Sequence, residues 1–451
     1  MSNIPLAQVS SQAPMTTFIE PTNKKFDWSN ILIPLLIVVV LIVLGVVIFL
    51  ATQLTSNPVS NTQNNQTNTN TDTTQDIVNS DVTNVFNSTF DIATTKWRKV
   101  NTTVPNPSDN LSTEGRLAKG KSGGDMGAVK NGTVIKDGDL YRMWYSGSTD
   151  LGNSNRQIYY AFSFDGYNWV KYDNSEPAVS DTVSTNGRIG FGTKGKGDDR
   201  ELANPEVVKV NGKYYMWYMG VPSTGEFENN YLVFLATSND GLTWTKVDNT
   251  IPARSDTTST NGRLGLAATP GRAEHISSIP GVEVVYKDNQ FYMWYVSGGG
   301  TYLATSPDGL TWTKYNNQMA ELSDTTSTDG RIPQGTAGKG DSGSSSLAAV
   351  FYSNNKFYAM YAGNPTNDGN NRHIFCAEST DGLTWTKLNN TIPTRSDSVS
   401  TDCRLPAGTT TSSSANGLNM IDIIVEDNKA KLYYLGISAD GGRMMFMAES
   451  F

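Results

Sequence analysis

Acidic residues that occur once along the chain, rather than in every repeat, are the groups that could carry out a reaction. Glu206, Glu283 and, more remotely, Asp125 are the candidates for catalysis, because a pair of carboxyl groups can supply one proton donor and one proton acceptor. The 451 residues include only 2 His and 2 Cys, and these show no zinc-finger spacing. We therefore predict no metal site and no cofactor, and place any chemistry on carboxylates.

The segments that must position these acids are repeated along the chain. One marker is a tryptophan that recurs at Trp97, Trp169, Trp244, Trp312 and Trp385. A second is the arginine of a Ser-Thr-X-X-Arg motif, which recurs at Arg116, Arg188, Arg263, Arg331 and Arg404. Both markers have the spacings 72, 75, 68 and 73 residues, so the sequence predicts five units.

Each unit contains four short segments that favour β-strands, because they are rich in Val, Tyr, Trp and Thr. In the second unit these segments are 206–210, 213–220, 231–238 and 243–247. Four-stranded units repeated around a ring are the blades of a β-propeller. The last unit lacks its Trp segment, whereas 96–100 (KWRKV) has no unit of its own. We therefore predict an all-β, five-bladed propeller over residues 86–451, closed by the N-terminal strand, which leaves no open sheet edge.

The motifs MWYSG, MWYMG and MWYVSG on the second strand, and Ser-X-Asp-Gly-X-Thr-Trp between the third and fourth, carry a family resemblance. They resemble five-bladed propellers of the arabinanase, levansucrase and invertase superfamily, which includes glycoside hydrolase families 43 and 32. The resemblance covers about residues 86–451 and is specific for the fold. A sialidase Asp-box, shortened by one residue, is a weaker match to the same hairpin.

In that superfamily the innermost strand starts at a central cavity and carries the acids, so the resemblance implies cleavage of glycosidic bonds by paired carboxyl groups. Aligned on the MWY motif, Glu206 matches the second-blade acid and Glu283 lies near the third-blade acid. Asn131 stands where the first-blade base is expected, and Asp125 would have to reach in through its loop. The alternative is that both glutamates line the cavity without reacting. A central Ca²⁺, which some relatives hold, needs convergent oxygen ligands that no spacing here indicates.

Polar residues at or just before the inner strands are predicted to bind the ligand. They are Asn131, Asn204, Asp199, Arg200, Arg272, His275 and Asp422. Planar and charged groups on one rim of a propeller favour a glycan-binding surface, whereas the alternative for each is a solvated loop residue. His275 titrates near neutral pH and could also act as an acid or base.

Features present in every blade are predicted to be scaffold. We expect eight tryptophans to pack between blades. They are the five outer tryptophans together with Trp144, Trp217 and Trp294. An aspartate seven residues before each repeated arginine predicts pairing between blades and turn capping. These aspartates are Asp109, Asp181, Asp256, Asp324 and Asp397. Cys376 falls on a strand and Cys403 in a loop, which leaves a disulfide between them open.

The N-terminal part of the chain differs in composition from the rest. Residues 31–52 are apolar and uncharged, which predicts a transmembrane signal-anchor helix. Two lysines precede this span and none follows it closely, so we expect residues 1–30 in the cytoplasm. Residues 53–85, rich in Asn and Thr, predict a flexible stalk. The propeller would then lie outside the cell or on a virion surface.

Two functions compete on these observations. The first is glycan recognition by a membrane-anchored surface propeller, in an attachment or carbohydrate-binding role. The alternative is a membrane-tethered glycoside hydrolase of the furanosidase-like type, and a purely structural coat role stays open. A sequence pI near 5 excludes a nucleic-acid binder held by phosphate contacts. The predicted partners are therefore a carbohydrate and, through residues 31–52, a lipid bilayer.

Overall fold

The computed structural model describes residues 82–451, apart from 151–153, 276–277, 367–370, 410–411, 413 and 439–441. The predicted tail, the predicted transmembrane segment and the predicted stalk up to residue 81 lie outside the described residues. Within the described part of the chain, no helix combines the length and apolar character needed to cross a bilayer.

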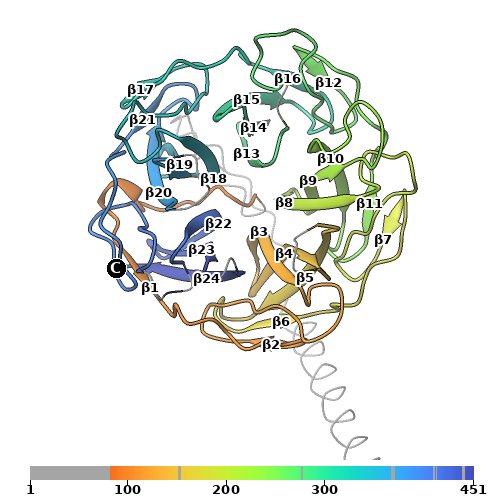
Figure 1. The fold of residues 1–451 in the computed structure, drawn as a ribbon, viewed down its shortest axis with the longest axis horizontal. Helices are drawn as coiled ribbons and strands as arrows, with labels where there is room; N and C mark the ends of the chain where they lie inside the picture. The colour runs from red at the N-terminus through yellow and green to blue at the C-terminus, as the bar shows by residue number, and fades with distance from the viewer. Residues whose placement is uncertain are drawn as a thin grey trace, which may run out of the picture. The chain divides into compact units, whose positions relative to one another are not determined.

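Five antiparallel sheets surround one axis, which confirms the predicted five-bladed propeller (Figure 1). From the axis outward, blade 1 contains β3 (Ala128–Asp137), β4 (Leu140–Ser148), β5 (Gln157–Ser163) and β6 (Trp169–Lys171). Blade 2 contains β8 (Glu201–Val210), β9 (Lys213–Val221), β10 (Leu232–Ser238) and β11 (Trp244–Lys246). Blade 3 contains β13 (Val282–Lys287), β14 (Gln290–Ser297), β15 (Gly300–Ser306) and β16 (Trp312–Lys314). Blade 4 contains β18 (Ser344–Ser353), β19 (Lys356–Asn364), β20 (His373–Ser379) and β21 (Trp385–Lys387).

Blade 5 is built from both ends of the propeller sequence. Its first three strands are β22 (Gly417–Glu426), β23 (Lys429–Ile437) and β24 (Arg443–Ser450), and its outer strand is β1 (Trp97–Lys99). Trp97 pairs with Ser450 in the antiparallel register. The predicted closure of the ring by the N-terminal strand is therefore confirmed.

Blades 1 to 4 each have a fifth strand that the sequence did not predict. These two-residue strands are β2 (Leu111–Ser112), β7 (Val183–Ser184), β12 (Thr258–Ser259) and β17 (Thr326–Ser327). Each pairs with the Trp strand of its blade and includes the serine of the repeated motif. The prediction of four strands per blade was wrong there, because this part of the loop hydrogen-bonds along the outer sheet edge.

The repeated aspartates cap loops, whereas their predicted pairing with the repeated arginines is wrong. Asp181 accepts hydrogen bonds from the Thr193 backbone N–H at 2.8 Å and the Thr193 hydroxyl at 2.6 Å. Arg188 instead forms an ion pair with Asp173 at 2.9 Å. Arg263 and Asp248 repeat that ion pair in blade 3, also at 2.9 Å.

Tryptophans pack between neighbouring blades, as predicted. Trp144 of blade 1 meets Trp244 of blade 2 edge-to-face, with ring centroids 5.6 Å apart. The pairs Trp217–Trp312 and Trp294–Trp385 repeat this contact at 5.6 and 5.7 Å. All six side chains are fully buried, so these aromatic pairs stabilise the blade interfaces and are not available to stack on a sugar.

Cys376 on β20 forms a disulfide with Cys403, with the two Cα atoms 6.3 Å apart. Cys403 takes the place of the glycine that precedes the repeated arginine in the other units. The bond ties blade 4 to the loop that leads into blade 5.

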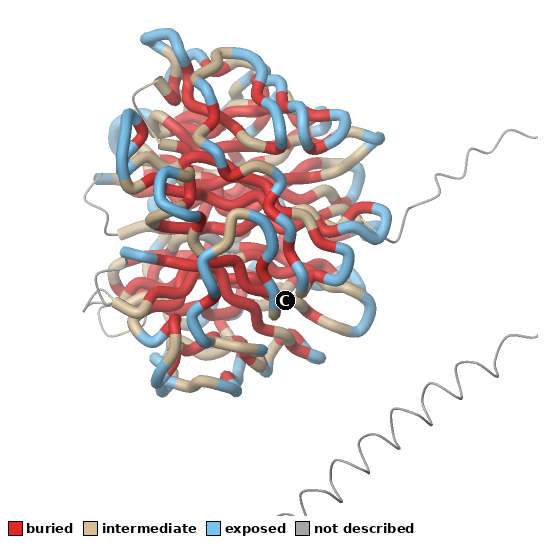
Figure 2. The backbone as a smooth tube through the Cα atoms, turned by 90° about the vertical axis from the view of Figure 1, so that its right-hand side faces the viewer, coloured by how far each residue is buried: buried red, intermediate tan, exposed pale blue. Residues whose placement is uncertain are grey.

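The innermost strands β3, β8, β13, β18 and β22 each contact the innermost strands of the two neighbouring blades. Figure 2 shows that the backbone is buried through the middle of the propeller and exposed mainly in the connecting loops. Residues 82–86 precede the first blade and lie against the ends of these inner strands. Val85 makes a parallel bridge to Tyr352 on β18, and the Thr83 backbone N–H donates to the Lys209 carbonyl of β8 at 3.2 Å.

Candidate active site at the centre of the ring

Five residues occupy one level of the inner strands, because each pairs with the equivalent residue of the second strand in its blade. The pairs are Thr133–Trp144, Glu206–Trp217, Glu283–Trp294, Ala349–Met360 and Asp422–Tyr433. Three of the five are acids, and we call Glu206, Glu283 and Asp422 the central acids. Their exposed fractions are 4%, 6% and 5%, so each is nearly closed off from solvent, and the charges of the three act on one another.

Side chains at this level accept a backbone hydrogen bond from the next blade. Asp422 accepts from the Val134 N–H of blade 1 at 2.5 Å, and Glu206 accepts from the Val284 N–H of blade 3 at 3.2 Å. The N–H of Val350 in blade 4 likewise bonds to Glu283. Ala349 has no side-chain acceptor, and the Ile423 N–H of blade 5 donates instead to Asp422 Oδ1 at 2.7 Å. The central acids therefore hold the blades together as well as lining the centre.

Burial raises the pKa of all three central acids, since a carboxylate is poorly solvated there. The charge of Asp422 raises the pKa of Glu206 further, and the charges of Glu206 and Asp422 do the same for Glu283; both pKa values are well above the usual range. The pKa of Asp422 is raised only to about 6, because hydrogen bonds from Val134, Ile423 and Thr133 favour its carboxylate. Glu206 and Glu283 therefore hold their protons to a higher pH than ordinary glutamates do, whereas the hydrogen bonds to Asp422 limit the rise of its pKa.

Asn131 does not occupy the level of the central acids. The β3–β4 register shifts between Lys130 and Gly132, so Asn131 is the extra residue of a bulge and Thr133 is the blade 1 counterpart of Glu206. Asn131 Nδ2 donates to Asn204 Oδ1 at 2.5 Å. These two predicted ligand residues thus lie together nearer the start of their strands, joining blades 1 and 2.

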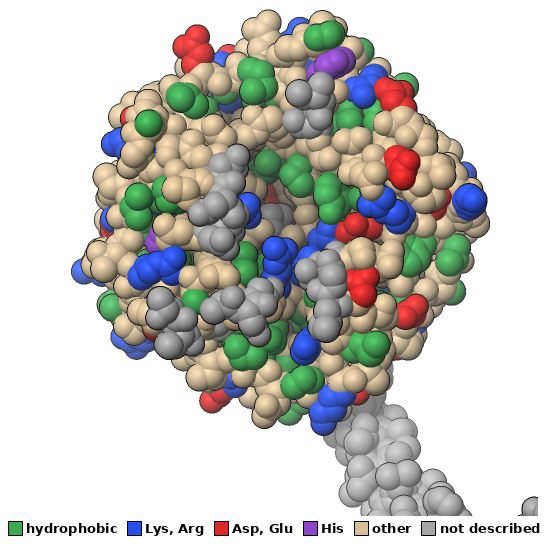
Figure 3. All heavy atoms as spheres, in the orientation of Figure 1, with side chains coloured by type: hydrophobic (Ala, Val, Ile, Leu, Met, Phe, Trp, Pro, Cys, Tyr) green, Lys and Arg blue, Asp and Glu red, His purple; other side chains and the backbone are tan. Residues whose placement is uncertain are grey.

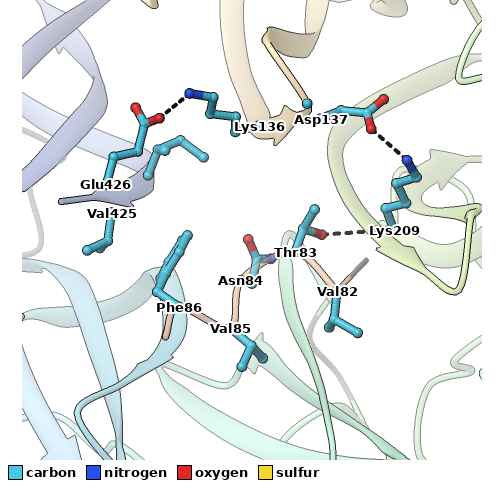
Figure 4. Close-up of a pocket in the computed structure, with 12 residues that line it drawn as sticks. Val82, Thr83, Asn84, Val85, Phe86, Lys136, Asp137, Lys209, Val425 and Glu426 are labelled. Atoms are coloured by element: carbon cyan, nitrogen blue, oxygen red, sulfur yellow. Dashed lines mark hydrogen bonds and ion pairs between the residues drawn. The ribbon is translucent and has the colours of Figure 1, made fainter. Parts of the chain in front are cut away.

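The opposite ends of the inner strands are covered by residues 82–86. Figure 4 shows this segment among Lys136 and Asp137 of β3, Lys209 of β8 and Glu426 of β22, which together line a pocket. Asn84 reaches the central acids, because its Nδ2 donates to Glu206 Oε1 and to the Val284 carbonyl, each at 3.2 Å. A ligand would therefore approach the central acids from the end where the inner strands start.

The structure places Asp125 in the scaffold. Its carboxylate forms a fully buried ion pair with Lys171 at 2.6 Å and accepts from the Tyr145 hydroxyl at 2.9 Å. Equivalent Lys–acid pairs join Lys246 to Asp198, Lys314 to Glu274 and Lys387 to Asp341. Because four blades share this arrangement, Asp125 has a structural explanation and is not brought to the central acids.

The remaining predicted ligand residues lie in loops. Asp199 accepts from the Ser223 backbone N–H at 2.6 Å, and Arg200 donates to Asn229. Arg272 donates to Asn317 Oδ1 at 2.8 Å, and His275 Nδ1 lies 3.3 Å from the Ala267 carbonyl oxygen. Each is engaged by its own loop or the adjoining one, and none contacts the central acids.

Sequence reasoning missed Thr133 and Asn84. Thr133 Oγ1 donates to Asp422 Oδ2 at 3.0 Å and receives the Val207 N–H at 3.4 Å. The alignment on the MWY motif contained its signal, because Thr133 stands two residues after Asn131 just as Glu206 stands two after Asn204. Asn84 carried no signal, since it lies in an Asn- and Thr-rich stretch. The described residues contain no group of three or more His, Cys, Asp or Glu able to hold a metal ion.

Comparison of the sequence with known proteins finds relatives over part of the chain. No family model matches the chain. An uncharacterized protein of Mycobacterium tuberculosis (strain H37Rv) is 34% identical over 115 residues, covering 25% of this chain and 31% of that protein. A 1,2-beta-oligomannan phosphorylase of Thermoanaerobacter sp. (strain X514) is 28% identical over 134 residues, 28% of this chain and 40% of that protein. The chain thus spans about a third of the length of the curated relatives it matches.

Solved structures match over most of the chain. A glycoside hydrolase and the protein BT0996, the latter solved in a complex with RGII, each align at a TM-score of 0.50 with 15% identity. Each alignment covers 79% of this protein and 92% of the matched one. At that identity the likeness establishes the fold. The chain is a five-bladed β-propeller, and its fold is similar to that of these two solved structures.

Proposed function

We propose that the chain cleaves a glycosidic bond of an oligosaccharide or polysaccharide, with the central acids as its catalytic residues. The observation that carries this proposal is the combination of buried carboxyl groups with different pKa values at one level of the ring. Glycosidic cleavage needs one protonated and one ionised carboxyl group. Glu206 or Glu283 would protonate the leaving oxygen, because their pKa values are raised well above the usual range. Asp422, with its pKa near 6, would act as base or nucleophile.

The relatives support a carbohydrate substrate, since the structural neighbours include a glycoside hydrolase and a sequence relative is an oligomannan phosphorylase.

Glycan recognition without turnover is the second candidate function. It is favoured by the backbone hydrogen bonds that Glu206 and Asp422 already accept and by Thr133 in place of an acid in blade 1.

The proposal also includes attachment to a membrane through residues 31–52. Extraction of membranes with alkaline carbonate would test it, because a protein that spans the bilayer stays in the membrane fraction.

The test compares turnover by the purified full-length chain with turnover by Glu206→Gln, Glu283→Gln and Asp422→Asn, on aryl furanosides, arabinans, β-fructans and β-mannans. Each substitution should lower turnover at least ~100-fold. Glu378→Gln is the matched control, since Glu378 pairs with Lys356 on blade 4 at 3.1 Å and should leave turnover unchanged. Glycan binding that survives all three substitutions, with no turnover by the native chain, would instead establish the recognition function.

A further inference from the structure

Basic side chains from blades 1 and 5 gather at the end of the ring where the inner strands start. Lys130 lies on β3, Arg156 immediately precedes β5, and Arg443 begins β24. Burial lowers the pKa of Lys130 most, the charges of Arg156 and Arg443 lower it further, and Glu201 and Asp150 oppose this, so the three cations lie close enough to act on one another. Figure 3 shows a hollow at the centre of the ring with Lys and Arg side chains beside it. We call Lys130, Arg156 and Arg443 the basic cluster.

Only one member of the basic cluster has a carboxylate partner. Arg156 forms an ion pair with Glu201 of β8 and donates to the Tyr231 hydroxyl. Within the part of the chain that the structure describes, Lys130 and Arg443 form no ion pair and their side chains make no hydrogen bond. Lys130 is only 4% exposed as a whole, but its Nζ is not among the fully buried atoms that lack a partner, so the ammonium can be reached by a ligand. This arrangement leaves room for an anionic group supplied by a ligand.

The basic cluster lies on the entrance side of the central acids. Lys130 precedes Thr133 by three residues on β3, and Glu201 precedes Glu206 by five on β8, which corresponds to about 10–16 Å of extended strand. Residues 82–86 cover the other end, so a ligand that reached the central acids would pass this cluster. Neutral sugars offer these cations only hydroxyl groups, whereas a carboxylate or sulfate can pair with arginine and lysine directly.

We propose that the basic cluster binds an acidic substituent of the carbohydrate, so that the substrate or ligand is a glycan bearing a carboxylate or sulfate. The inference rests on the proposed carbohydrate function and names its substrate class. Lys130 and Arg443 would pair with the anion, and Arg156, held by Glu201 and Tyr231, would fix its orientation. The bound anion would position the neighbouring sugar linkage toward the central acids.

The test measures binding by calorimetry to the purified full-length chain at low salt. The probes are galacturonate, glucuronate and galactose 6-sulfate, compared with galacturonate methyl ester and galactose, which lack the charge. At least one acidic sugar should bind ten-fold or more tightly than its neutral counterpart. Lys130→Met and Arg443→Gln should each remove most of that preference. Lys213→Met is the matched control, because Lys213 is an exposed lysine at the other end of its blade and its loss should change nothing.

Three results would overturn the inference: equal binding of acidic and neutral sugars, an acidic preference that survives Lys130→Met, and binding of inorganic phosphate with no binding of the acidic sugars. The native chain provides a second measurement that needs no variant, since binding of the acidic sugar must weaken as salt rises while ester binding stays constant. Turnover or binding of neutral glycans without any acidic preference would leave the proposed function intact. Failure of every glycan to bind or react would remove both.

Discussion

Asn84 Nδ2 donates a hydrogen bond of 3.2 Å to Glu206 Oε1, across 122 residues of sequence. The bond connects the segment that precedes the first blade to an acid at the centre of the ring. Asn84 thus belongs to the candidate site, although it lies outside the repeats that define the propeller.

We expect Asn84→Ala to lower the free energy of unfolding by about 1–2 kcal/mol, because it removes two buried hydrogen bonds, to Glu206 and to the Val284 carbonyl. It should also raise the pKa of Glu206, since this hydrogen bond favours the carboxylate. Urea denaturation measures the first effect. Asn101→Ala is the control, because it removes exposed hydrogen bonds, one to Glu114 at 2.7 Å and two from Thr103, and should cost less than ~0.5 kcal/mol. Equal losses in the two variants would contradict the buried role of Asn84.

Asp422→Asn should change the pH dependence of stability. The pKa of Asp422 is near 6 in the folded chain, against 3.8 ordinarily, so the native state binds the proton more tightly than the unfolded state does. Its contribution therefore favours folding at low pH and is lost as pH rises between about 4 and 6. The difference in unfolding free energy between native chain and variant should shift by roughly 3 kcal/mol across this window. A difference that is constant with pH would show that the pKa of Asp422 is not raised.

Binding of an acidic sugar should weaken above neutral pH. Burial and the charges of Arg156 and Arg443 lower the pKa of Lys130 to about 7, while Glu201 and Asp150 act in the opposite direction. Deprotonation removes the charge that attracts the anion, so the dissociation constant of the acidic sugar should rise between pH 6 and 9. Lys130→Met should remove most of this pH dependence, as calorimetry at several pH values would show. A native profile that is flat over this range would mean that Lys130 does not contact the anion.

Asp125→Asn should destabilise the fold without acting on the reaction. It leaves the Lys171 ammonium, 2.6 Å from the lost charge and fully buried, without its counter-ion, which costs about 3–5 kcal/mol. Asp198→Asn is the matched control, because Asp198 makes the equivalent buried pair with Lys246 at 2.7 Å. Both variants should lose similar stability by urea denaturation and keep their turnover per folded molecule. Loss of turnover in the Asp125 variant alone would restore Asp125 as a catalytic candidate.

Replacing Cys376 and Cys403 together by serine should lower the free energy of unfolding by about 3–4 kcal/mol. The disulfide closes a segment with a sequence separation of 27 residues, and its loss frees that loop in the unfolded chain. Thermal denaturation with and without a thiol reductant measures the effect. The reductant should lower the melting temperature of the native chain and leave that of the double variant unchanged.

The fold was predictable because its markers repeat. The outer tryptophans and the arginines of the Ser-Thr-X-X-Arg motif recur with the same spacings, and a chain of equivalent blades explains why the two series agree. The positions of Glu206, Glu283 and Asp422 followed from the same alignment. Asn131 was assigned to the acid position of blade 1, although the same alignment sets Thr133 beside Glu206 and Asn131 beside Asn204. Asp125 looked unrepeated because its counterparts include Glu274 as well as Asp198 and Asp341. Contacts between distant segments, such as Asn84 with Glu206, leave no local pattern.

The pairing of β1 with β24 has a consequence for how the chain is made. Residues 97–99 emerge from the ribosome long before residues 443–450, so their sheet partner does not exist until the whole propeller sequence has been made. Until then the nascent ring has two unsatisfied strand edges, which are prone to pair with other chains. A premature stop that deletes β24 should leave the ring unsealed and prone to aggregation. Completion of β24 is therefore the step at which both open strand edges become paired and the propeller closes.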